Sequence, residues 1–204
     1  MHLRSSHCLA LCAFLSVTSG AAADICSEGA CIVVENDLAT QETDPFMFLG
    51  KYVDGEHPQF KNYDRIIRRF DSPADCLGPS ARDQDTVDLL QIDWNKVGTG
   101  KIAEVCVFRI LRSLANTDDI IFWLEHHDFT VTGPTKKSPG VIRSGQDIVN
   151  DKDILGTWTL DRFRSERPSL LSFFGVELVN SYDVLVQLDQ YNNVVGINAI
   201  VSTK

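Results

Sequence analysis

Residues 182–201 read YDVLVQLDQYNNVVGINAIV and carry the clearest secondary-structure pattern in the chain. In the first half, an apolar side chain occurs at every second residue, as in a β-strand with one buried face. The same alternation returns in the second half, after the polar residues 190–193 that are typical of a turn. The segment therefore predicts an antiparallel hairpin with an apolar inner face. Its inward residues are Tyr182, Val184, Val186 and Leu188, then Val195, Ile197, Ala199 and Val201.

Upstream of this hairpin, from Thr86 onward, segments rich in apolar and β-branched residues predict further strands. The segment 101–111 is apolar on both alternating faces, as expected of a central strand, and 120–131 has the same character. For 120–131 the alternative is a helix capped by Thr117. Gly98-Thr99-Gly100 is expected to form a hairpin turn between two strands. The strands predicted before the hairpin are 90–94, 101–111, 120–131 and 154–160.

One segment has helical periodicity instead. Its apolar side chains recur at steps of three and four residues and predict an amphipathic helix over 59–70, which Asp71 and Pro73 end. A one-turn helix capped by Ser72 is expected to follow. The chain is therefore predicted to be an α+β domain: a mainly antiparallel sheet with one good amphipathic helix near the N-terminal part of the mature chain. The apolar residues of the long helix are Phe60, Tyr63, Ile66, Ile67 and Phe70.

The first 23 residues have the layout of a secretory signal peptide. A short leader containing Arg4 precedes an apolar run over 8–17, and Ala21 and Ala23 form an A-x-A cleavage pattern before Asp24. The apolar run is too short to cross a bilayer. We therefore expect cleavage after Ala23, a secreted or periplasmic protein, a single domain over 24–204 and no transmembrane span in the mature chain.

Two of the six cysteines lie in the predicted signal peptide, which leaves Cys26, Cys31, Cys76 and Cys106. An even number of cysteines in an oxidising compartment favours disulfide bonds. Three connectivities are possible, and we favour Cys26–Cys31 with Cys76–Cys106. The sequence shows no cysteine and histidine cluster with the spacing of a zinc site. We therefore expect neither a metal nor a cofactor.

The segment Glu125-His126-His127-Asp128 is the strongest candidate for catalysis. On a strand, Glu125 and His127 would share one face, and His126 and Asp128 the other. Either carboxylate–imidazole pair can serve in general acid–base catalysis or form half of a metal site. The plain alternative is a strand that turns polar as it leaves the core. Gly98-Thr99-Gly100-Lys101 lacks the spacing of a phosphate-binding loop.

Arg162, Arg164 and Arg167 stand out in a chain whose 19 Lys+Arg and 28 Asp+Glu give a formal net charge of −9. They can bind an anionic ligand or an acidic partner through bidentate contacts, or pair locally with carboxylates. The acidic balance argues against nucleic acid and anionic membrane surfaces. The segment 170–179, LLSFFGVELV, predicts a helix that packs on the sheet or an apolar surface that docks a partner.

These observations favour an exported binding or interaction module. It would be stabilised by disulfides and would bind a protein or a small anionic ligand in the envelope or medium. The first alternative is a small secreted hydrolase that uses Glu125/His127 or His126/Asp128, since a catalytic triad needs no local motif. The second alternative is a purely structural envelope component or enzyme subunit.

Overall fold

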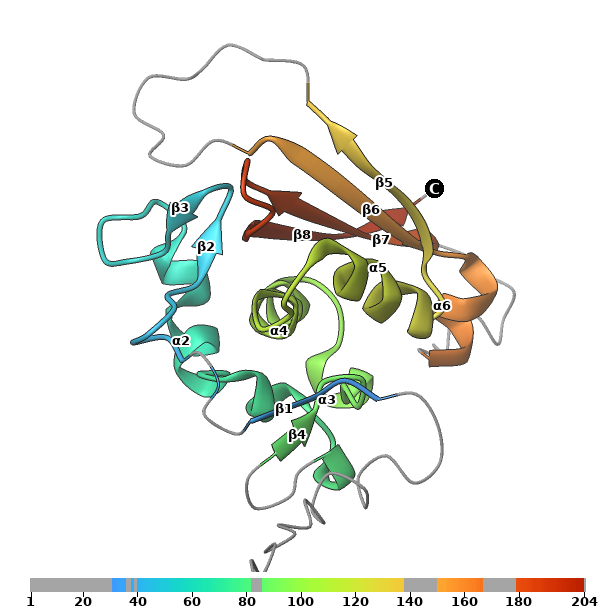
Figure 1. The fold of residues 1–204 in the computed structure, drawn as a ribbon, viewed down its shortest axis with the longest axis horizontal. Helices are drawn as coiled ribbons and strands as arrows, with labels where there is room; N and C mark the ends of the chain where they lie inside the picture. Colours follow the sequence, from blue (N-terminus) through green and yellow to red (C-terminus); the bar gives the residue numbers. More distant parts are fainter. Residues whose placement is uncertain are drawn as a thin grey trace, which may run out of the picture.

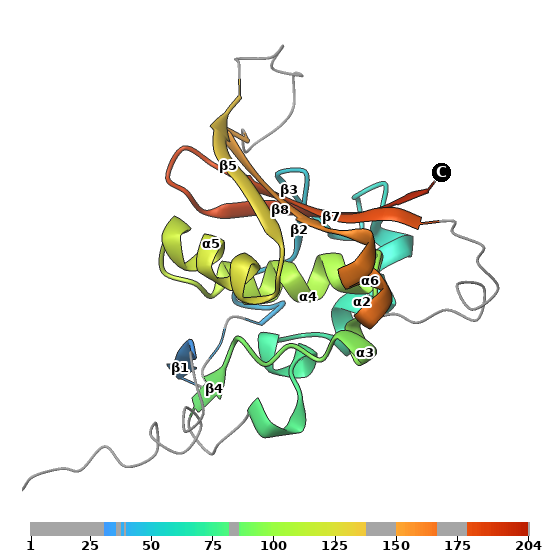
Figure 2. The same cartoon turned by 90° about the vertical axis from the view of Figure 1, so that its right-hand side faces the viewer.

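Four antiparallel strands form one sheet, in the spatial order β5 (Thr130–Lys136), β6 (Lys152–Trp158), β7 (Val179–Leu188) and β8 (Val194–Thr203) (Figure 1). The computed structural model describes residues 31–35, 38, 40–81, 86–137, 150–166 and 179–203. Two helices lie beneath the sheet, and a two-stranded pair lies farthest from it (Figure 2). The predicted α+β class with a mainly antiparallel sheet is confirmed. The helices are α4 (Lys101–Arg112) and α5 (Thr117–His126), and the pair is β1 (Val33–Glu35) with β4 (Thr86–Asp88).

The predicted C-terminal hairpin is confirmed as β7 and β8. Its register runs from Tyr182 opposite Val201 to Leu188 opposite Val194. Every second side chain of β7 between Tyr182 and Leu188 is fully buried, and α4 packs against the neighbouring strand β8. The strand predicted at 154–160 is also confirmed, as β6. This apolar face supplies much of the driving force for folding, because burial contributes roughly 25 cal/mol per Å².

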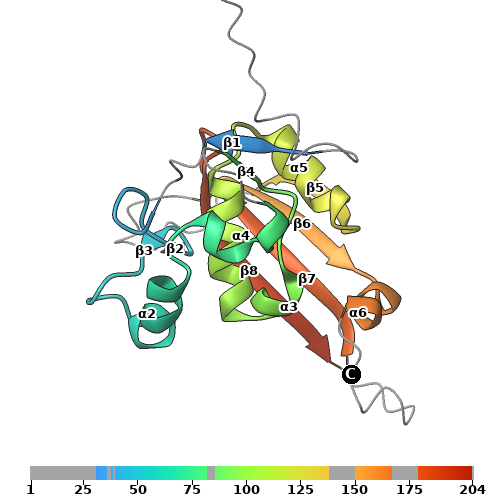
Figure 3. The ribbon, with the colours of Figure 1, turned by 90° about the horizontal axis from the view of Figure 1, so that it is seen from below.

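Segment 101–111 forms helix α4, so the predicted central strand is wrong. All residues from Ala103 to Leu111 are buried, because α4 lies between the sheet and the layer that contains β1 and β4 (Figures 2 and 3). A helix buried on all sides has a nearly continuous apolar run, which is also the pattern of a central strand. Two charged residues, Glu104 and Arg109, are buried with it.

The predicted hairpin turn at 98–100 is a junction between two helices. Helix α3 (Trp94–Val97) ends at Gly98 and α4 begins after Gly100, and these glycines have φ angles of 70° and 77°. Such positive φ values favour glycine. The predicted strand over 90–94 is also wrong, since Trp94 is the first residue of α3. The Asp93 carboxylate caps this helix by accepting hydrogen bonds from the amides of Asn95 and Lys96.

Segment 117–126 forms helix α5, so the strand predicted over 120–131 is wrong and the alternative helix is correct, although its cap is Asn116 rather than Thr117. The side chain of Asn116 caps this helix by accepting a hydrogen bond from the Asp119 amide at 2.9 Å. The inward side chains, Ile120, Trp123 and Leu124, recur at helical spacing. The sequence pattern over 120–131 was ambiguous because it includes both the end of α5, at His126, and the start of β5, at Thr130.

The predicted amphipathic helix is confirmed as α2 (Phe60–Arg69), which buries Tyr63 and Ile67. The one-turn helix after Ser72 is confirmed as η1 (Pro73–Cys76), and the Asp75 carboxylate accepts a hydrogen bond from the Ser72 amide at 3.0 Å. The remaining short elements are η2 (Pro79–Ala81), β2 (Met47–Phe48), β3 (Lys51–Tyr52) and α6 (Leu160–Glu166).

The predicted Cys76–Cys106 disulfide is present and joins η1 to α4. The Cα atoms of the two cysteines are 5.6 Å apart, and 30 positions separate them in the sequence. Both sulfurs lie in the core. Cys31 is also disulfide-bonded, but its predicted partner, Cys26, lies outside the described residues. The protein is thus a disulfide-stabilised module.

A buried carboxylate occupies the free edge of β8. Glu104 of α4 accepts a hydrogen bond from the Ala199 amide at 3.2 Å and another from the Tyr63 hydroxyl at 2.5 Å. Burial and the Glu104 carboxylate raise the pKa of Tyr63 well above its usual value, so its hydroxyl remains a donor. Farther along the same edge, the Gly50 amide donates to the Val195 carbonyl at 2.8 Å. One side chain thus links α2, α4 and β8.

Several predictions fall outside the described residues. These are the signal peptide over 1–23, the segment 170–178 and Arg167, together with the side chain of Arg164. Among the helices of the described part, none is both long enough and apolar enough to cross a membrane.

Candidate functional site

The structure does not bring together the predicted carboxylate–histidine pairs. Because Glu125 and His126 lie on α5 rather than on a strand, the argument that paired these residues by strand faces is wrong. Glu125, His126 and Asp128 are exposed, whereas His127 is buried. In the described part of the chain, no hydrogen bond or ion pair joins Glu125 to His127 or His126 to Asp128.

His127 lies inside a cluster of aromatic side chains. Its ring centroid is 4.3 Å from that of Trp123 and 5.7 Å from that of Trp94. The Trp94 indole donates to Nδ1 at 3.4 Å, and the Trp158 indole donates to the His127 carbonyl at 2.6 Å. The Nε2 atom is buried and has no hydrogen-bond partner among the described residues. His127 is therefore part of the core.

Burial, together with smaller contributions from the nearby His126 and Arg162, lowers the pKa of His127 from its ordinary value of 6.5 to about 3. The unfolded chain therefore binds a proton near pH 6 that the folded protein excludes. Stability should accordingly fall as the pH drops below 6.5 toward 3. Between pH 6.5 and 5 we expect a loss of about 2 kcal/mol in the free energy of unfolding, since one pKa unit corresponds to about 1.4 kcal/mol.

Urea denaturation at a series of pH values measures this loss. The control is His127→Gln, which keeps an acceptor but cannot be protonated. As the pH falls from 6.5 to 5, the free energy of unfolding of this variant should fall less steeply than that of the unmodified chain. The two slopes should differ by the contribution of about one bound proton. Equal pH slopes for both proteins would contradict the assignment of the effect to His127.

The one candidate arginine whose side chain is described pairs locally. The Arg162 guanidinium Nε lies 3.3 Å from the Asp128 carboxylate, and its Cζ lies 5.7 Å from the ring centroid of Trp158. The local ion pair that the sequence left open as the alternative is therefore present at Arg162. The Asp128 side chain is 64% exposed, so this pair contributes little to stability.

A cavity of about 430 Å³ lies between the end of α4, the start of α5 and the turn that joins β7 to β8. Asp44 completes its wall from a distant part of the chain. We call this space the polar cavity, since most of its lining side chains carry hydrogen-bonding groups. Its polar residues are Asp44, Arg112, Asn116, Thr117, Tyr191, Asn192 and Asn193.

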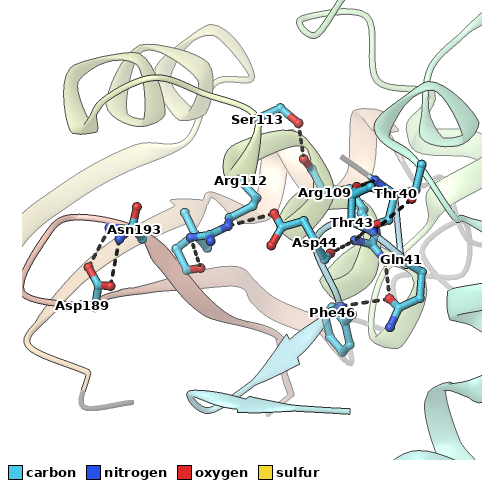
Figure 4. Close-up of polar contacts among 11 residues, drawn as sticks. Thr40, Gln41, Thr43, Asp44, Phe46, Arg109, Arg112, Ser113, Asp189 and Asn193 are labelled. Atoms are coloured by element: carbon cyan, nitrogen blue, oxygen red, sulfur yellow. Dashed lines mark hydrogen bonds and ion pairs between the residues drawn. The ribbon is translucent and has the colours of Figure 1, made fainter. Parts of the chain in front are cut away.

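Arg112 joins three walls of the polar cavity (Figure 4). Its Nε lies 2.9 Å from the Asp44 carboxylate, and its Nη1 donates to the Val194 carbonyl at 3.4 Å. Both members of the ion pair remain partly exposed, at 28% for the Arg112 side chain and 19% for that of Asp44. The pair is thus accessible from the cavity while it fixes the relative positions of α4, the Asp44 loop and β8.

A second arginine, one helical turn earlier, fixes the loop that carries Asp44. Arg109 is buried and donates to the carbonyls of Thr40 and Asp44 and to the side-chain oxygen of Gln41 (Figure 4). The same Gln41 oxygen accepts from the Phe46 amide at 2.9 Å. Burial lowers the pKa of Arg109, but a guanidinium remains charged at physiological pH. Arg109 thus places the Asp44 carboxylate opposite Arg112.

The turn that closes the polar cavity is also ordered by a carboxylate. Asp189 accepts hydrogen bonds from the amides of Tyr191 and Asn193, each at 2.8 Å, and from the Asn193 side chain at 2.9 Å. Lys152 on β6 donates to the Asn192 side chain at 2.7 Å. These contacts hold Tyr191 at the rim, where it is 74% exposed.

Sequence reasoning missed the polar cavity. The polar turn at 190–193 was predicted, because Asp and Asn are typical turn residues. Nothing in the sequence connects that turn with Asp44 and Arg112, which are 68 positions apart. Neither the polar cavity nor a second cavity, of about 450 Å³ between α2 and β3, is lined by any residue of 125–128.

Comparison with protein-family models, curated proteins and solved structures finds no match for this chain. Within the described ranges, no group of three or more His, Cys, Asp or Glu side chains is arranged to hold a metal ion.

Proposed function

We propose that this protein is an exported binding module that takes a small polar ligand into the polar cavity. The observation that carries the proposal is the Asp44–Arg112 ion pair, which is ordered by Arg109 and still accessible from the cavity. Charged groups that are fixed in place before binding lose little entropy when a ligand arrives. Small-molecule sites in proteins generally combine such preformed polar groups with a cavity of this size.

The lining favours binding over turnover. Among its described residues there is no histidine, cysteine or lysine, and no hydrogen bond joins the hydroxyl of Thr117 or Tyr191 to a base that could activate it. Its one carboxylate already pairs with Arg112. The prediction of an anionic ligand relied on Arg162, Arg164 and Arg167. Of these, Arg162 pairs with the Asp128 carboxylate. We therefore assign the ligand site to the polar cavity rather than to those arginines.

Export is the second part of this proposal. It is supported by the signal-peptide pattern over 1–23 and by the Cys76–Cys106 bond, because structural disulfides persist mainly in oxidising compartments. N-terminal sequencing of the protein recovered from the periplasm or medium should give Asp24 as the first residue. Recovery of an uncleaved chain from the cytoplasm would contradict export.

Binding is tested by titrating ¹⁵N-labelled, oxidised protein with small solutes that are neutral, anionic, cationic or zwitterionic. We expect at least one class to shift the amide signals of 112–117 and 191–194, which border the polar cavity. The variant Tyr52→Ala is a matched control, since Tyr52 is another exposed tyrosine and lines the second cavity. Signals that shift only around Tyr52, or not at all, would contradict the proposal.

A further inference from the structure

The polar cavity has a balanced charge. Among the described lining residues, Asp44 and Arg112 are the acid and the base, and they already form an ion pair at 2.9 Å. An anionic ligand would have to take Arg112 from Asp44, and a cationic ligand would have to take Asp44 from Arg112. Either ligand would also lie beside the like charge of the other member of the pair, and this repulsion opposes binding. The site therefore favours a ligand that adds hydrogen bonds to the pair without separating it.

The ion pair retains hydrogen-bonding capacity on both sides. A guanidinium has five N–H donors, and the contacts described for Arg112 use its Nε and Nη1. Of the two Asp44 carboxylate oxygens, Oδ2 faces Arg112. A ligand with adjacent hydroxyl groups can donate one proton to the carboxylate and accept a hydrogen bond from the guanidinium. Hydroxyls do both at once, whereas ammonium groups only donate and carboxylates only accept.

Tyr191 adds an apolar surface to this polar site. An exposed tyrosine by itself needs no explanation. Tyr191, however, borders the cavity, and the Asp189 carboxylate fixes its backbone through the amide at 2.8 Å. Asn116 and Asn193 also belong to the lining, and their side chains bond to Asp119 and Asp189. The site thus combines an exposed aromatic ring with the Asp44–Arg112 pair, and this combination suits a ligand with one apolar and one hydroxylated side.

We infer that the ligand of the polar cavity is a neutral carbohydrate, bound as a pyranose ring or a short oligosaccharide. A pyranose has a face of C–H groups, which packs on an aromatic ring, and a rim of vicinal hydroxyls, which bonds to the Asp44–Arg112 pair. The volume of about 430 Å³ accommodates one or two sugar rings. This inference rests on the proposed function, because it names the ligand class of that same site.

The experiment follows the same amide signals while glucose, galactose, mannose, N-acetylglucosamine, maltose or cellobiose is added. Glucuronate, glucosamine and glycine serve as anionic, cationic and zwitterionic probes. At least one neutral saccharide should produce saturable shifts in 112–117 and 191–194. Tyr191→Ala should weaken that saccharide at least about fivefold, as expected when an aromatic contact is truncated. Tyr191→Phe, which keeps the ring, should recover most of the affinity that Tyr191→Ala loses. Tyr52→Ala, in the second cavity, should leave the Kd within about twofold.

The outcomes separate this inference from the proposed function. If only glucuronate, glucosamine or glycine shifts the cavity signals, the assignment of a neutral carbohydrate is overturned and the binding function stands. If no probe of any class shifts them, both fail. If a saccharide binds equally well to the unmodified protein and to Tyr191→Ala, the proposed contact with the ring is wrong and the carbohydrate pose is overturned.

Discussion

Replacing Arg109 with methionine is expected to lower the free energy of unfolding by about 3–4 kcal/mol. The Asp44 carbonyl would lose its donor, while the Thr40 carbonyl and the Gln41 oxygen would each keep one backbone donor. An unsatisfied buried acceptor costs about 1–3 kcal/mol, and each hydrogen bond to a charged group contributes about 1.5–3 kcal/mol. Methionine fills most of the volume of the arginine stem, so the loss reports the hydrogen bonds more than a cavity. Because Asp44 belongs to the loop that Arg109 holds, ligand binding should weaken as well. Urea denaturation followed by tryptophan fluorescence measures the change.

The matched control is Arg112→Met, the same substitution one helical turn along α4. Arg112 is partly exposed and its ion pair with Asp44 is of the kind that contributes at most about 1 kcal/mol. We expect Arg112→Met to leave stability nearly unchanged. Arg109→Lys should fall between Arg109→Met and the unmodified protein, because an ammonium keeps the charge but lacks the planar fork. Equal losses in Arg109→Met and Arg112→Met would show that burial of Arg109 is not the cause.

Removing the Cys76–Cys106 disulfide is expected to cost about 3–4 kcal/mol. The bond closes a loop whose ends are 30 positions apart, and the loop-entropy relation gives this magnitude for that length. The double variant Cys76→Ala/Cys106→Ala removes the bond without leaving a thiol to form other disulfides. Urea denaturation of the oxidised proteins should show a lower midpoint for the double variant. Its free energy of unfolding should fall by the stated amount.

Reduction provides the control. A reductant should lower the stability of the unmodified protein toward that of the double variant, while changing the double variant much less. Cys31 is also disulfide-bonded, so the remaining sensitivity of the double variant reports that second bond. A double variant as stable as the unmodified protein would contradict a stabilising role for the Cys76–Cys106 bond.

The sequence predicted the elements whose pattern is local. The β7–β8 hairpin was predictable because alternation over Tyr182–Leu188 and a polar turn occur within one short stretch. Helix α2 was predictable because one of its faces is exposed, which leaves a clear amphipathic period. Helix α4 was not, since both faces are buried and a buried helix and a central strand have the same apolar run. Gly98 and Gly100 did not distinguish the helix from the strand, because glycine is common both in hairpin turns and at the ends of helices.

The candidate site was harder to predict than the fold. Asp44, Arg112 and Tyr191 come from three distant segments, and none of them belongs to a recognisable motif. Their proximity depends on the packing of α4 against β8, and that helix was predicted as a strand. His127 illustrates the opposite error, because an imidazole between charged neighbours in sequence is enclosed by tryptophans in space. Residue type alone could not distinguish a reactive histidine from one in the core.

The contacts of Glu104 and Gly50 with β8 affect how the protein can self-associate. An unpaired strand edge is a template for adding strands from other molecules, which leads to fibrils. Here the Ala199 amide and the Val195 carbonyl already have intramolecular partners. The opposite edge, β5, contains Pro134, which has no amide to donate. Each edge of the sheet thus carries a feature that hinders the addition of strands, and we expect the protein to resist edge-to-edge association.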